Sequence, residues 1–476
     1  MTHTVTGSVV GEGPVSRLAP TVVLGLGVTG RAVARALAAR GLPVVLVDDA
    51  PSAAATDLAG ELGVALVGRP GSEALAALLD GAGAWVPAPG LPESHPAFAV
   101  GAARGVPAVG ELDLAAAWDP RPCVAVTGTD GKTTVTALIR LMLVASGIAA
   151  VEAGNTDIPL VAAIDDPDPE VFVVEASSFR LAPLRRFAPV AACWLNFGPD
   201  HQDVHLDLGR YEAAKANVWR GFGPDQLAVA NRDDPVVMGH AVGRPHLETF
   251  GLGPTPDGPG GHWSVDGSVL RTPEGAGIVD ASELERALPH DLANALAAAA
   301  VARAAGATLD GTAAALRAFR HLPHRVQLLG QANGVRWYDD SKATAPHAAL
   351  AAVAGFTSVV LIAGGRNKGL DLSVLGAGAP HLRAVVAIGE ATDEVAAAFA
   401  GVRPVTTARS MDDAVRAAAE AARPGDVVLL SPACASFDWY RSYGERGDDF
   451  ARAVAALGVT ATPSTTGPPR PGRLGQ

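Results

Sequence analysis

The chain has 476 residues, of which 49% are hydrophobic and 5% aromatic, and its formal net charge is −12. This length exceeds one typical domain, so two to four domains are expected. The acidic balance without a basic stripe argues against a nucleic-acid partner, and no apolar run approaches membrane-spanning length. Its three cysteines are too widely spaced for a disulfide framework or a zinc site and fit a reducing compartment, so we expect a cytoplasmic protein.

Short apolar runs alternate with Ala- and Leu-rich helical patterns, which predicts parallel sheets and an α/β fold. Strands are expected at residues 21–24, 44–47, 124–126, 171–174, 190–195, 358–363, 384–388 and 426–430. Pro-containing segments around residues 118–122 and 321–324 indicate hinges and divide the chain into domains at 19–119, 120–321 and 322–458. Residues 1–18 are expected to form a flexible leader, and residues 459–476 a disordered tail.

A glycine-rich turn follows the first expected strand. Gly25, Gly27 and Gly30 have the G-x-G-x-x-G spacing, and Asp48 ends the next strand pattern. Taken alone, this fingerprint indicates an NAD-binding oxidoreductase or sensor. The loop requires only a diphosphate at a helix N-terminus and a hydroxyl-bearing group near the acid, and a UDP-sugar offers both. A turn that binds no ligand is a third interpretation.

A second phosphate-loop pattern reads Thr-Gly-Thr-Asp-Gly-Lys-Thr-Thr over residues 127–134 and precedes a helical pattern. In such a loop the backbone N–H groups cradle phosphate oxygens, the Lys132 ammonium reaches the terminal phosphates, and the Thr133 hydroxyl binds Mg²⁺. Val126 occupies the first glycine position of the usual G-x-x-x-x-G-K-[ST] pattern. The loop predicts the use of a nucleoside triphosphate. A ligase that acts on a nucleotide-linked substrate explains both loops.

Further polar residues lie after expected strands of the central domain. Glu175 closes one strand, where a carboxylate faces the ligand crevice and binds Mg²⁺ as a Walker-B acid does. His201 is a candidate ligand of a second metal, although a lone histidine after a strand is more often a surface residue. Lys215 lies on an expected helix, where a solvated side chain is the default interpretation. Asn155 lies in an expected turn.

The last domain carries polar clusters near the ends of its expected strands. Arg325 precedes the run Asp340–Thr344, Lys368 follows the strand at residues 358–363, and Ser436 follows a later strand. A basic residue, an acid and hydroxyls at such positions suit a carboxylate-bearing small molecule, and ordinary loop chemistry is the alternative for each. Cys434 has no positive neighbour close in sequence, so a buried structural thiol is favoured over a nucleophile.

Taken in order, these motifs resemble those of the Mur ligase family of peptidoglycan synthesis, from about residue 21 to residue 457. The resemblance rests on residues 128–134, 175–179, 200–201, 322–325, 340–344 and 431–436. It implies an N-terminal Rossmann-like domain, a central P-loop ATPase-like domain with a parallel sheet, and a C-terminal Rossmann-like domain. The Asp-Ser-Lys-Ala-Thr run favours members that add D-glutamate, since siblings typically carry Tyr-Ala-His there.

The resemblance implies a monomeric ATP-dependent ligase that joins D-glutamate to UDP-N-acetylmuramoyl-L-alanine through an acyl phosphate, with two Mg²⁺ ions. Lys215 matches the family lysine that CO₂ converts to a carbamate, an anion that helps to place the second metal. Two related activities remain as alternatives. One is a Mur ligase that adds another amino acid such as L-glutamate. The other is a folylpolyglutamate synthase, which lacks the UDP-type first domain.

Each implied role falls on residues that match the family's motifs. The UDP substrate is expected at Val28, Thr29, Asp48, Gly90 and Asn155. ATP is expected at Gly128, Thr129, Asp130, Gly131, Lys132, Thr133, Thr134, Asn294, Arg325 and Asp340. Metal binding is expected at Thr133, Glu175, His201 and the carbamate of Lys215, and glutamate binding at Lys342, Thr344, Lys368 and Ser436. The expected catalytic residues are Lys132, Lys215, His201 and Asn155.

Three departures from the family pattern affect substrate contacts. Ala88 replaces a serine of the first domain, which removes one hydroxyl, and Asp49 stands where a threonine is often seen. Arg366 and Asn367 replace a more acidic pair before Lys368. None of these positions belongs to the phosphate-transfer motifs, so the reaction class is unaffected.

Overall fold

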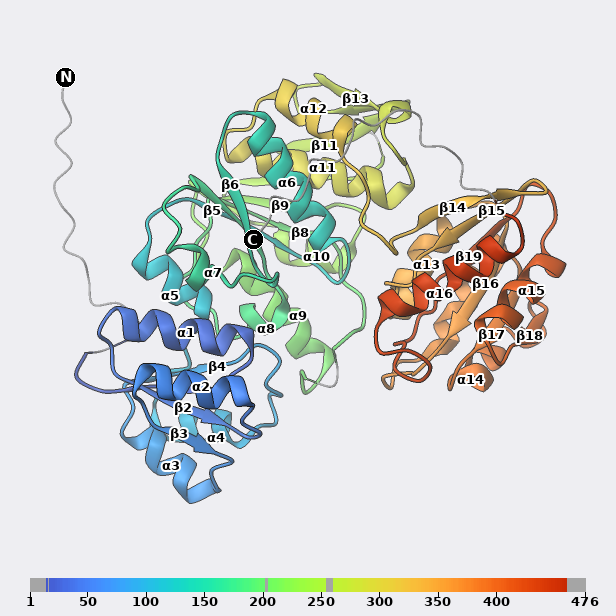
Figure 1. The fold of residues 1–476 in the computed structure, drawn as a ribbon. Coiled ribbons are helices and arrows are strands. Elements are labelled where there is room, and N and C mark those ends of the chain that lie inside the picture. The colour runs from blue at the N-terminus through green and yellow to red at the C-terminus, as the bar shows by residue number, and fades with distance from the viewer. Residues whose placement is uncertain (1–13, 16, 202–203, 254–259, 460–476) are drawn as a thin grey trace, which may run out of the picture. The chain divides into compact units, whose positions relative to one another are not determined.

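The computed structural model describes residues 14–15, 17–201, 204–253 and 260–459. Residues 1–13 and 16 of the predicted leader and residues 460–476 of the predicted tail lie outside the described residues. The chain divides into two compact units, one up to Arg320 and one from His321 (Figure 1). Strands and helices alternate in both units, which confirms the predicted α/β class, and the described strands form three sheets.

The first sheet is parallel and has the strand order β3-β2-β1-β4. Val23 of its central strand packs into one buried cluster, whereas Val22 and Leu24 pack into another, because side chains alternate across a strand. Its strands are β1 (Thr21–Leu24), β2 (Val44–Asp48), β3 (Leu66–Gly68) and β4 (Ala84–Pro87). Its helices are α1 (Val28–Ala39), α2 (Ala53–Leu62), α3 (Ser72–Asp80), α4 (Pro96–Arg104) and α5 (Glu111–Trp118).

The second sheet has nine strands in the order β13-β12-β11-β10-β9-β8-β5-β7-β6. The parallel strands are β5 (Cys123–Thr127), β6 (Ala150–Gly154), β7 (Val171–Glu175), β8 (Ala191–Trp194), β9 (Leu227–Asn231), β10 (Leu247–Phe250) and β11 (Gly261–Asp266). An antiparallel extension adds β12 (Val269–Arg271) and β13 (Gly277–Asp280). The helices are α6 (Lys132–Ala145), α7 (Leu160–Ala163), α8 (Ser178–Leu181), α9 (Leu208–Ala216), η1 (Asn217–Trp219), α10 (Pro235–Ala241), η2 (Ala281–Glu283), α11 (Pro289–Ala304) and α12 (Leu309–Ala318).

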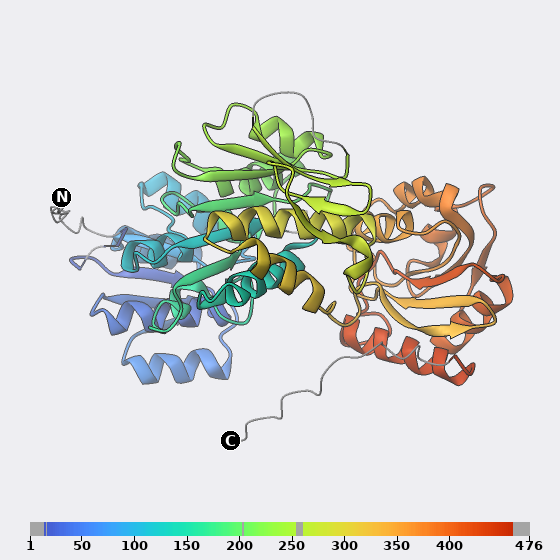
Figure 2. The same ribbon diagram turned by 90° about the horizontal axis from the view of Figure 1, so that it is seen from above.

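Both faces of this second sheet are covered. Val124 and Val126 of β5 pack with α6, α11 and α12, whereas Ala125 packs with the cluster that includes α5, α7 and η1. Figure 2 shows the gold helices α11 and α12 running alongside the green strands. A parallel sheet buried on both faces accounts for the continuous apolar runs that revealed its strands in the sequence.

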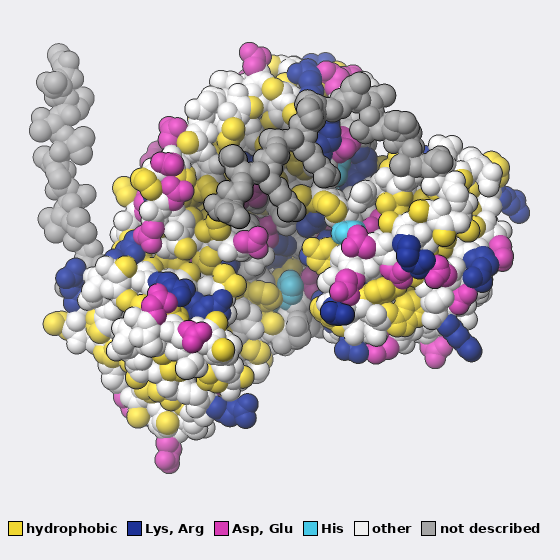
Figure 3. Space-filling model, viewed as in Figure 1, with side chains coloured by type: hydrophobic (Ala, Val, Ile, Leu, Met, Phe, Trp, Pro, Cys, Tyr) yellow, Lys and Arg dark blue, Asp and Glu magenta, His cyan; other side chains and the backbone are white. Residues whose placement is uncertain are grey.

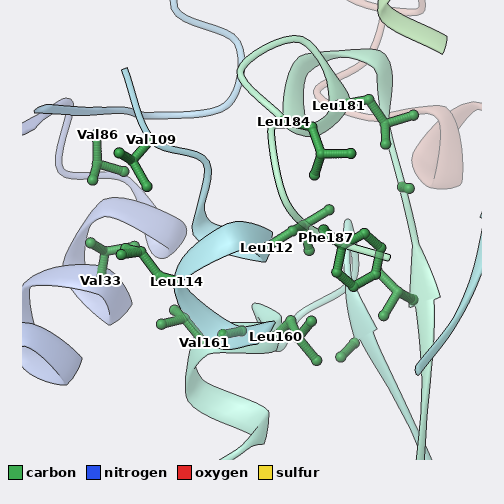
Figure 4. Close-up of a cluster of buried hydrophobic side chains, with 14 of the residues drawn as sticks. Val33, Val86, Val109, Leu112, Leu114, Leu160, Val161, Leu181, Leu184 and Phe187 are labelled. Carbon is green, nitrogen blue, oxygen red and sulfur yellow. The ribbon is translucent and has the colours of Figure 1, made fainter. Parts of the chain in front are cut away.

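Helix α5 lies where the cores of the first two sheets merge. Figure 4 shows Leu112 and Leu114 of α5 between Val33 of α1 and a group from the second sheet's layer that includes Leu160 and Phe187. All of these side chains belong to one buried cluster. Continuous apolar packing through α5 therefore joins the layers of the first two sheets.

The second unit contains a six-stranded sheet in the order β14-β15-β19-β16-β17-β18, parallel except for the β14–β15 hairpin. Its strands are β14 (Gln327–Ala332), β15 (Val335–Asp339), β16 (Val359–Gly364), β17 (Leu382–Ile388), β18 (Val405–Thr407) and β19 (Val427–Leu430). Its helices are α13 (Pro346–Ala354), η3 (Leu372–His381), α14 (Thr392–Ala398), α15 (Met411–Ala421) and α16 (Tyr443–Ala456).

The described surface bears on two of the exclusions made from composition. On the face shown in Figure 3, acidic and basic side chains are interspersed over each unit rather than gathered in a basic stripe. Among the described helices, none has both the length and the apolar character needed to cross a bilayer.

Candidate active site

The phosphate-loop pattern forms the turn between β5 and α6. Helix α6 begins at Lys132, so the N–H groups of its first turn, which includes Thr133 and Thr134, lack partners inside the helix and carry the positive end of its dipole. Thr129 N–H donates to the Asn196 carbonyl (3.0 Å), and Asp130 N–H donates to Asn196 Oδ1 (2.8 Å). Asn196 thus fixes the loop in a shape that presents the helix N-terminus to an anion.

Two lysine side chains meet at the base of this loop. Lys132 Nζ donates to the carbonyl oxygens of Gly128 and Thr129 (2.8 Å each). Lys215 Nζ, from α9, donates to the same Gly128 carbonyl (2.6 Å) and lies 4.6 Å from the centre of the Tyr211 ring. Lys215 is only 1% exposed. Burial and the neighbouring Lys132 charge lower the pKa of Lys215 well below 10.5, against the raising effect of Asp200 and Asp130. The sequence's default interpretation of a solvated lysine is therefore wrong.

Gly131 of the loop touches Asn294, a predicted ATP contact on α11. Gly131 has φ +82°, and a Cβ there would lie 2.6 Å from Asn294 Oδ1. Gly147, at the other end of α6, has φ +83° and open space around its Cβ position. The two glycines therefore have nearly the same φ angle and differ in what a side chain would meet.

Gly131→Ala is expected to weaken ATP binding by at least about tenfold, because the new methyl group displaces Asn294. Gly147→Ala is the matched control and should leave ATP affinity unchanged. Both variants should lose about 1–2 kcal/mol of unfolding free energy, because alanine is strained at positive φ. Calorimetric ATP titration and urea unfolding measure the two effects. Equal ATP affinities for the two variants would rule out a role for the Gly131–Asn294 contact.

Glu175 and Asn155 lie together at the carboxyl edge of the second sheet. Glu175 is the last residue of β7, is 3% exposed and pairs in register with Val126, just before the phosphate loop. Asn155 Nδ2 donates to Glu175 Oε1 and Asn155 N–H donates to the Glu175 carbonyl, both at 2.8 Å. The carboxylate predicted to bind metal is thus buried beside the loop predicted to bind phosphate.

His201 lies after β8 with its backbone at φ +54°. Its Nε2 is 3.4 Å from Asp200 Oδ2, and its ring packs edge-on against Phe179 at 4.7 Å between centroids. Phe179 follows Glu175 closely in sequence, in α8. His201 is therefore held against the segment that follows the candidate metal carboxylate.

The donor set suits Mg²⁺ bound together with phosphate. Two buried hydroxyls at this edge, Thr127 Oγ1 and Ser177 Oγ, have no hydrogen-bond partner among the described residues. Among the described residues, no three or more His, Cys, Asp or Glu side chains form a cluster that could hold a metal ion by themselves. Mg²⁺ typically takes one or two carboxylates and completes its shell with phosphate oxygens and water. Glu175 and Thr133 fit such a site.

Lysine is rare in this chain, and its positions are informative. Of the 37 lysine and arginine residues, only Lys132, Lys215, Lys342 and Lys368 are lysines. All four are predicted site residues. Arginine serves wherever a cation alone is enough, whereas a compact ammonium, or an amine that can lose its proton, requires lysine. This signal in the sequence would have singled out Lys215 without any motif.

The glycine loop of the first sheet forms the turn between β1 and α1. Gly25 has φ +88°, and a Cβ there would lie 2.7 Å from Ala88 Cβ. Asp48 accepts hydrogen bonds from the N–H groups of Leu26 (2.6 Å) and Ala50 (2.9 Å). Val28 is 56% exposed at the start of α1. Asp48 thus braces the loop and keeps only part of its acceptor capacity for a ligand.

Thr29 and Gly90 differ in their surroundings. Thr29 is buried, and its hydroxyl accepts a hydrogen bond from Arg180 (2.9 Å), so its side chain is turned away from a ligand at the loop. Gly90 is exposed and lines a cavity of about 320 Å³ whose walls also include Ala88, Phe179 and Arg210. A substrate that lies over the glycine loop has room to extend into this cavity.

The predicted residues of the second unit lie on loops that are bonded to one another. Asp340 N–H donates to the Leu430 carbonyl (2.8 Å), and Ser431 Oγ donates to Asp340 Oδ2 (2.7 Å). The Lys368 loop joins the Ser436 loop through backbone hydrogen bonds between Arg366 and Ala435 (2.8 and 3.0 Å). The loops after β15, β16 and β19 therefore form one edge.

Within this edge the individual side chains differ in exposure. Lys368 is exposed, Arg325 and Thr344 are half-buried, and Ser436 is buried. Lys342 Nζ lies 4.0 Å from the centre of the Tyr443 ring. Burial raises the pKa of Cys434 to about 12, which disfavours the thiolate and agrees with a structural thiol.

Two further groups shape this edge: Arg446 is buried and gave no signal in the sequence, whereas His324 is half-buried and lies in the motif at residues 322–325. Arg446 of α16 donates to Ser341 Oγ (2.9 Å), to the Ser341 carbonyl (2.8 Å) and to the Cys434 carbonyl (3.1 Å). His324 Nδ1 is 2.7 Å from Asp339 Oδ2, and this hydrogen bond raises the pKa of His324. Asn196, in the first unit, was also missed, although it follows a strand just as Glu175 does.

Comparison with known proteins identifies the family. The chain matches the model of the Mur ligase middle domain over residues 126–302 and that of the Mur ligase, glutamate ligase domain over residues 324–434. It is 45% identical to UDP-N-acetylmuramoylalanine–D-glutamate ligase of Frankia casuarinae, over 92% of this chain and 94% of that protein. It is 38% identical to the protein of the same name from Nitrosococcus oceani, over 92% and 97% of the two chains.

Solved structures show the same fold at low sequence identity. A pseudomurein peptide ligase type C from Methanothermus fervidus aligns with a TM-score of 0.55 and 17% identity, over 92% of this chain and all of that one. UDP-N-acetylmuramate-alanine ligase from Thermotoga maritima aligns with a TM-score of 0.52 and 16% identity, over 92% and 100% of the two chains. These alignments show the fold, and the family models and the relatives establish that the chain belongs to the Mur ligase family.

Proposed function

We propose that this chain is an ATP-dependent ligase that joins D-glutamate to the carboxylate of UDP-N-acetylmuramoyl-L-alanine. The observation that carries this function is the phosphate loop, in which Lys132 and Lys215 both donate to the Gly128 carbonyl. The relatives of this chain at 37–45% identity are named D-glutamate ligases. The enzyme is a cytoplasmic monomer of peptidoglycan precursor synthesis. Residues 19–119 form a Rossmann-like UDP domain, residues 120–321 a P-loop ATPase-like domain, and residues 322–458 a Rossmann-like amino-acid domain.

The reaction begins with activation of the carboxylate by ATP, because a free carboxylate is a poor electrophile. A carboxylate oxygen of the UDP substrate bonds to the γ-phosphorus of ATP, the bond to the bridging oxygen breaks, and ADP leaves. The glutamate amine then attacks the acyl carbon, loses a proton, and phosphate departs as the amide forms. The positive charge of Lys132 and of the N-terminus of α6 offsets the repulsion between the carboxylate and the γ-phosphate.

The remaining roles follow from the donor set. Thr133, Glu175 and His201 would hold two Mg²⁺ ions, which neutralise developing phosphate charge when bound. Contacts to ATP are assigned to residues 128–134, Asn294, Arg325 and Asp340. The UDP substrate is assigned to Val28, Thr29, Asp48, Gly90 and Asn155, and glutamate to Lys342, Thr344, Lys368 and Ser436.

Lys215 is proposed to be carbamylated. Only a neutral amine attacks CO₂, and burial beside Lys132 favours the neutral form of Lys215. The neutral amine nitrogen bonds to the carbon of CO₂ and releases one proton, so that an uncharged side chain near the phosphate loop becomes an anion. An anion at this position attracts Mg²⁺, whereas an ammonium repels it.

Phosphate release from ATP and Mg²⁺ tests the function. The purified chain should release phosphate only when both UDP-N-acetylmuramoyl-L-alanine and D-glutamate are present. Release with L-glutamate instead would retain the ligase and change its acceptor. If neither amino acid supports release, while NADH rather than the UDP substrate shifts the melting temperature, the glycine loop of the first sheet serves a dinucleotide and the proposed function is wrong.

A further inference from the structure

Arg180 forms a buried ionic network between the layers of the first two sheets. Its Nη2 donates to Thr29 Oγ1 (2.9 Å), and its Nη1 pairs with Glu111 Oε1. The second oxygen of Glu111 accepts from Val161 N–H (3.2 Å) at the start of α7. Arg180, Glu111 and Thr29 are 5%, 4% and 7% exposed. A guanidinium taken this far out of water is held in one place by its partners, because each lost partner leaves a buried charge or donor unsatisfied.

The two ends of this network are the proposed substrate loops. Thr29 lies in the first turn of α1, within the glycine loop of residues 25–30 that is proposed to bind the UDP diphosphate. Arg180 lies in α8, five residues after Glu175, the proposed metal ligand. Because the Thr29 side chain points into the protein, it contributes to substrate binding by fixing the position of the α1 backbone.

Helix α8 is joined to the first sheet's loops at a second point. Ser178 Oγ lies 2.9 Å from His205 Nε2, and His205 Nδ1 lies 2.9 Å from Glu93 Oε1. Glu93, in the loop after β4, lines the same cavity as Gly90. One four-residue helix after the metal carboxylate is thus tied to both loops that surround the proposed UDP site. The apolar packing shown in Figure 4 brings the layers together, but apolar contacts alone do not fix the position of α8 relative to these loops.

We propose that Arg180 is a positioning residue for the UDP-bearing substrate, which sets the first turn of α1 against the segment that follows Glu175. This inference rests on the proposed function. Arg180 touches no reacting atom in this role. It acts through Thr29, so that the substrate's diphosphate and its carboxylate are placed together, and it has no part in holding ATP.

Steady-state kinetics of four single variants and one double variant test this role. Thr29→Val removes only the hydroxyl and keeps the Arg180–Glu111 pair, whereas Arg180→Met removes both contacts. Arg186→Met changes an exposed arginine of the same segment, and Thr56→Val changes an exposed threonine of α2, so these two are the matched controls. The KM for the UDP substrate, the KM for ATP and kcat are measured for each variant.

Thr29→Val should raise the KM for the UDP substrate by about tenfold and leave the KM for ATP within about twofold. Arg180→Met should raise the KM for the UDP substrate at least as much. Adding Thr29→Val to Arg180→Met should have no further effect, because the Arg180–Thr29 hydrogen bond is already absent. A purely structural role would instead lower the active fraction and spare both KM values, and this result would overturn the inference. So would a further loss in the double variant, since the hydroxyl would then touch substrate directly.

Two controls keep the outcomes separate. If Arg180→Met does not fold, Arg180→Lys replaces it in the cycle, because lysine retains the charge but lacks the planar guanidinium that bonds Thr29 and Glu111 together. An inactive wild-type chain would refute the proposed function. An active wild type whose Thr29→Val variant keeps its KM would refute only the positioning role.

Discussion

Lys132→Ala is expected to lower the rate of phosphate release by about 100- to 1000-fold, the typical cost of removing one preorganised donor to transition-state charge. The Lys132 ammonium donates hydrogen bonds to two backbone carbonyls of the loop, at 2.8 Å each. A bound γ-phosphate offers it charged oxygens in place of these neutral ones, so its attraction grows as charge develops during transfer. The measurement is the initial rate at saturating ATP and UDP substrate.

The control for this variant is Arg140→Met on the same helix. Arg140 is a partly exposed cation paired with Glu152 (2.9 Å) and lies two turns beyond Lys132. Its removal changes the net charge equally but should leave the rate within about twofold, since an exposed ion pair is worth little. A Lys132→Ala enzyme with near-normal turnover would show that this loop does not bind the reacting phosphates.

Lys215→Met is expected to abolish turnover while making the fold more stable at neutral pH. Because the pKa of Lys215 is lowered in the folded state, the unfolded state binds more protons at every pH between that lowered value and 10.5. The wild-type free energy of unfolding therefore rises with pH across this window, by at most about 1.4 kcal/mol per pH unit from this group. Lys215→Met lacks this slope, so its advantage shrinks as pH approaches 10.5.

Urea unfolding of both proteins in CO₂-free buffer from pH 6 to pH 10 measures this slope. Added bicarbonate should then raise the midpoint of the wild type alone, because CO₂ captures the neutral amine of the folded state. In turnover assays, Lys215→Ala should regain part of its activity with a small carboxylate such as formate. Parallel pH profiles for wild type and Lys215→Met would contradict the lowered pKa, and a bicarbonate effect on both would contradict the carbamate.

The sequence predicted the strands that are continuous apolar runs and the residues that close such runs. Runs such as residues 171–174 and 426–430 marked strands because both faces of the parallel sheets are buried. Glu175 was predicted to face the ligand edge because it closes a parallel strand, and the structure places it at the end of β7. The strands β11, β12 and β13 were missed, since their polar and glycine-rich stretch over residues 261–280 carries no apolar run. The expected strands also did not include β3, β4, β6, β9, β10, β14 or β18.

Long-range polar contacts were not predictable in the same way. Arg180 and Thr29 lie 151 residues apart, and nothing near either one indicates that they meet. Lys215 appeared to be an ordinary surface lysine until the fold placed it on the Gly128 carbonyl. The family resemblance suggested the proposed carbamate role of Lys215, and its burial gives a physical reason for a neutral amine. The small number of lysines in the chain was a further indication, visible in the composition, that Lys215 has a specific role.

Oxygen transfer is the most direct measurement of the proposed chemistry. UDP-N-acetylmuramoyl-L-alanine labelled with ¹⁸O in its free carboxylate is incubated with the chain, ATP, Mg²⁺ and D-glutamate, and the released phosphate is analysed by mass spectrometry. A ligase that forms an acyl phosphate transfers one labelled oxygen to each phosphate. Phosphate free of ¹⁸O, released while the amide product accumulates, would contradict carboxylate activation by ATP.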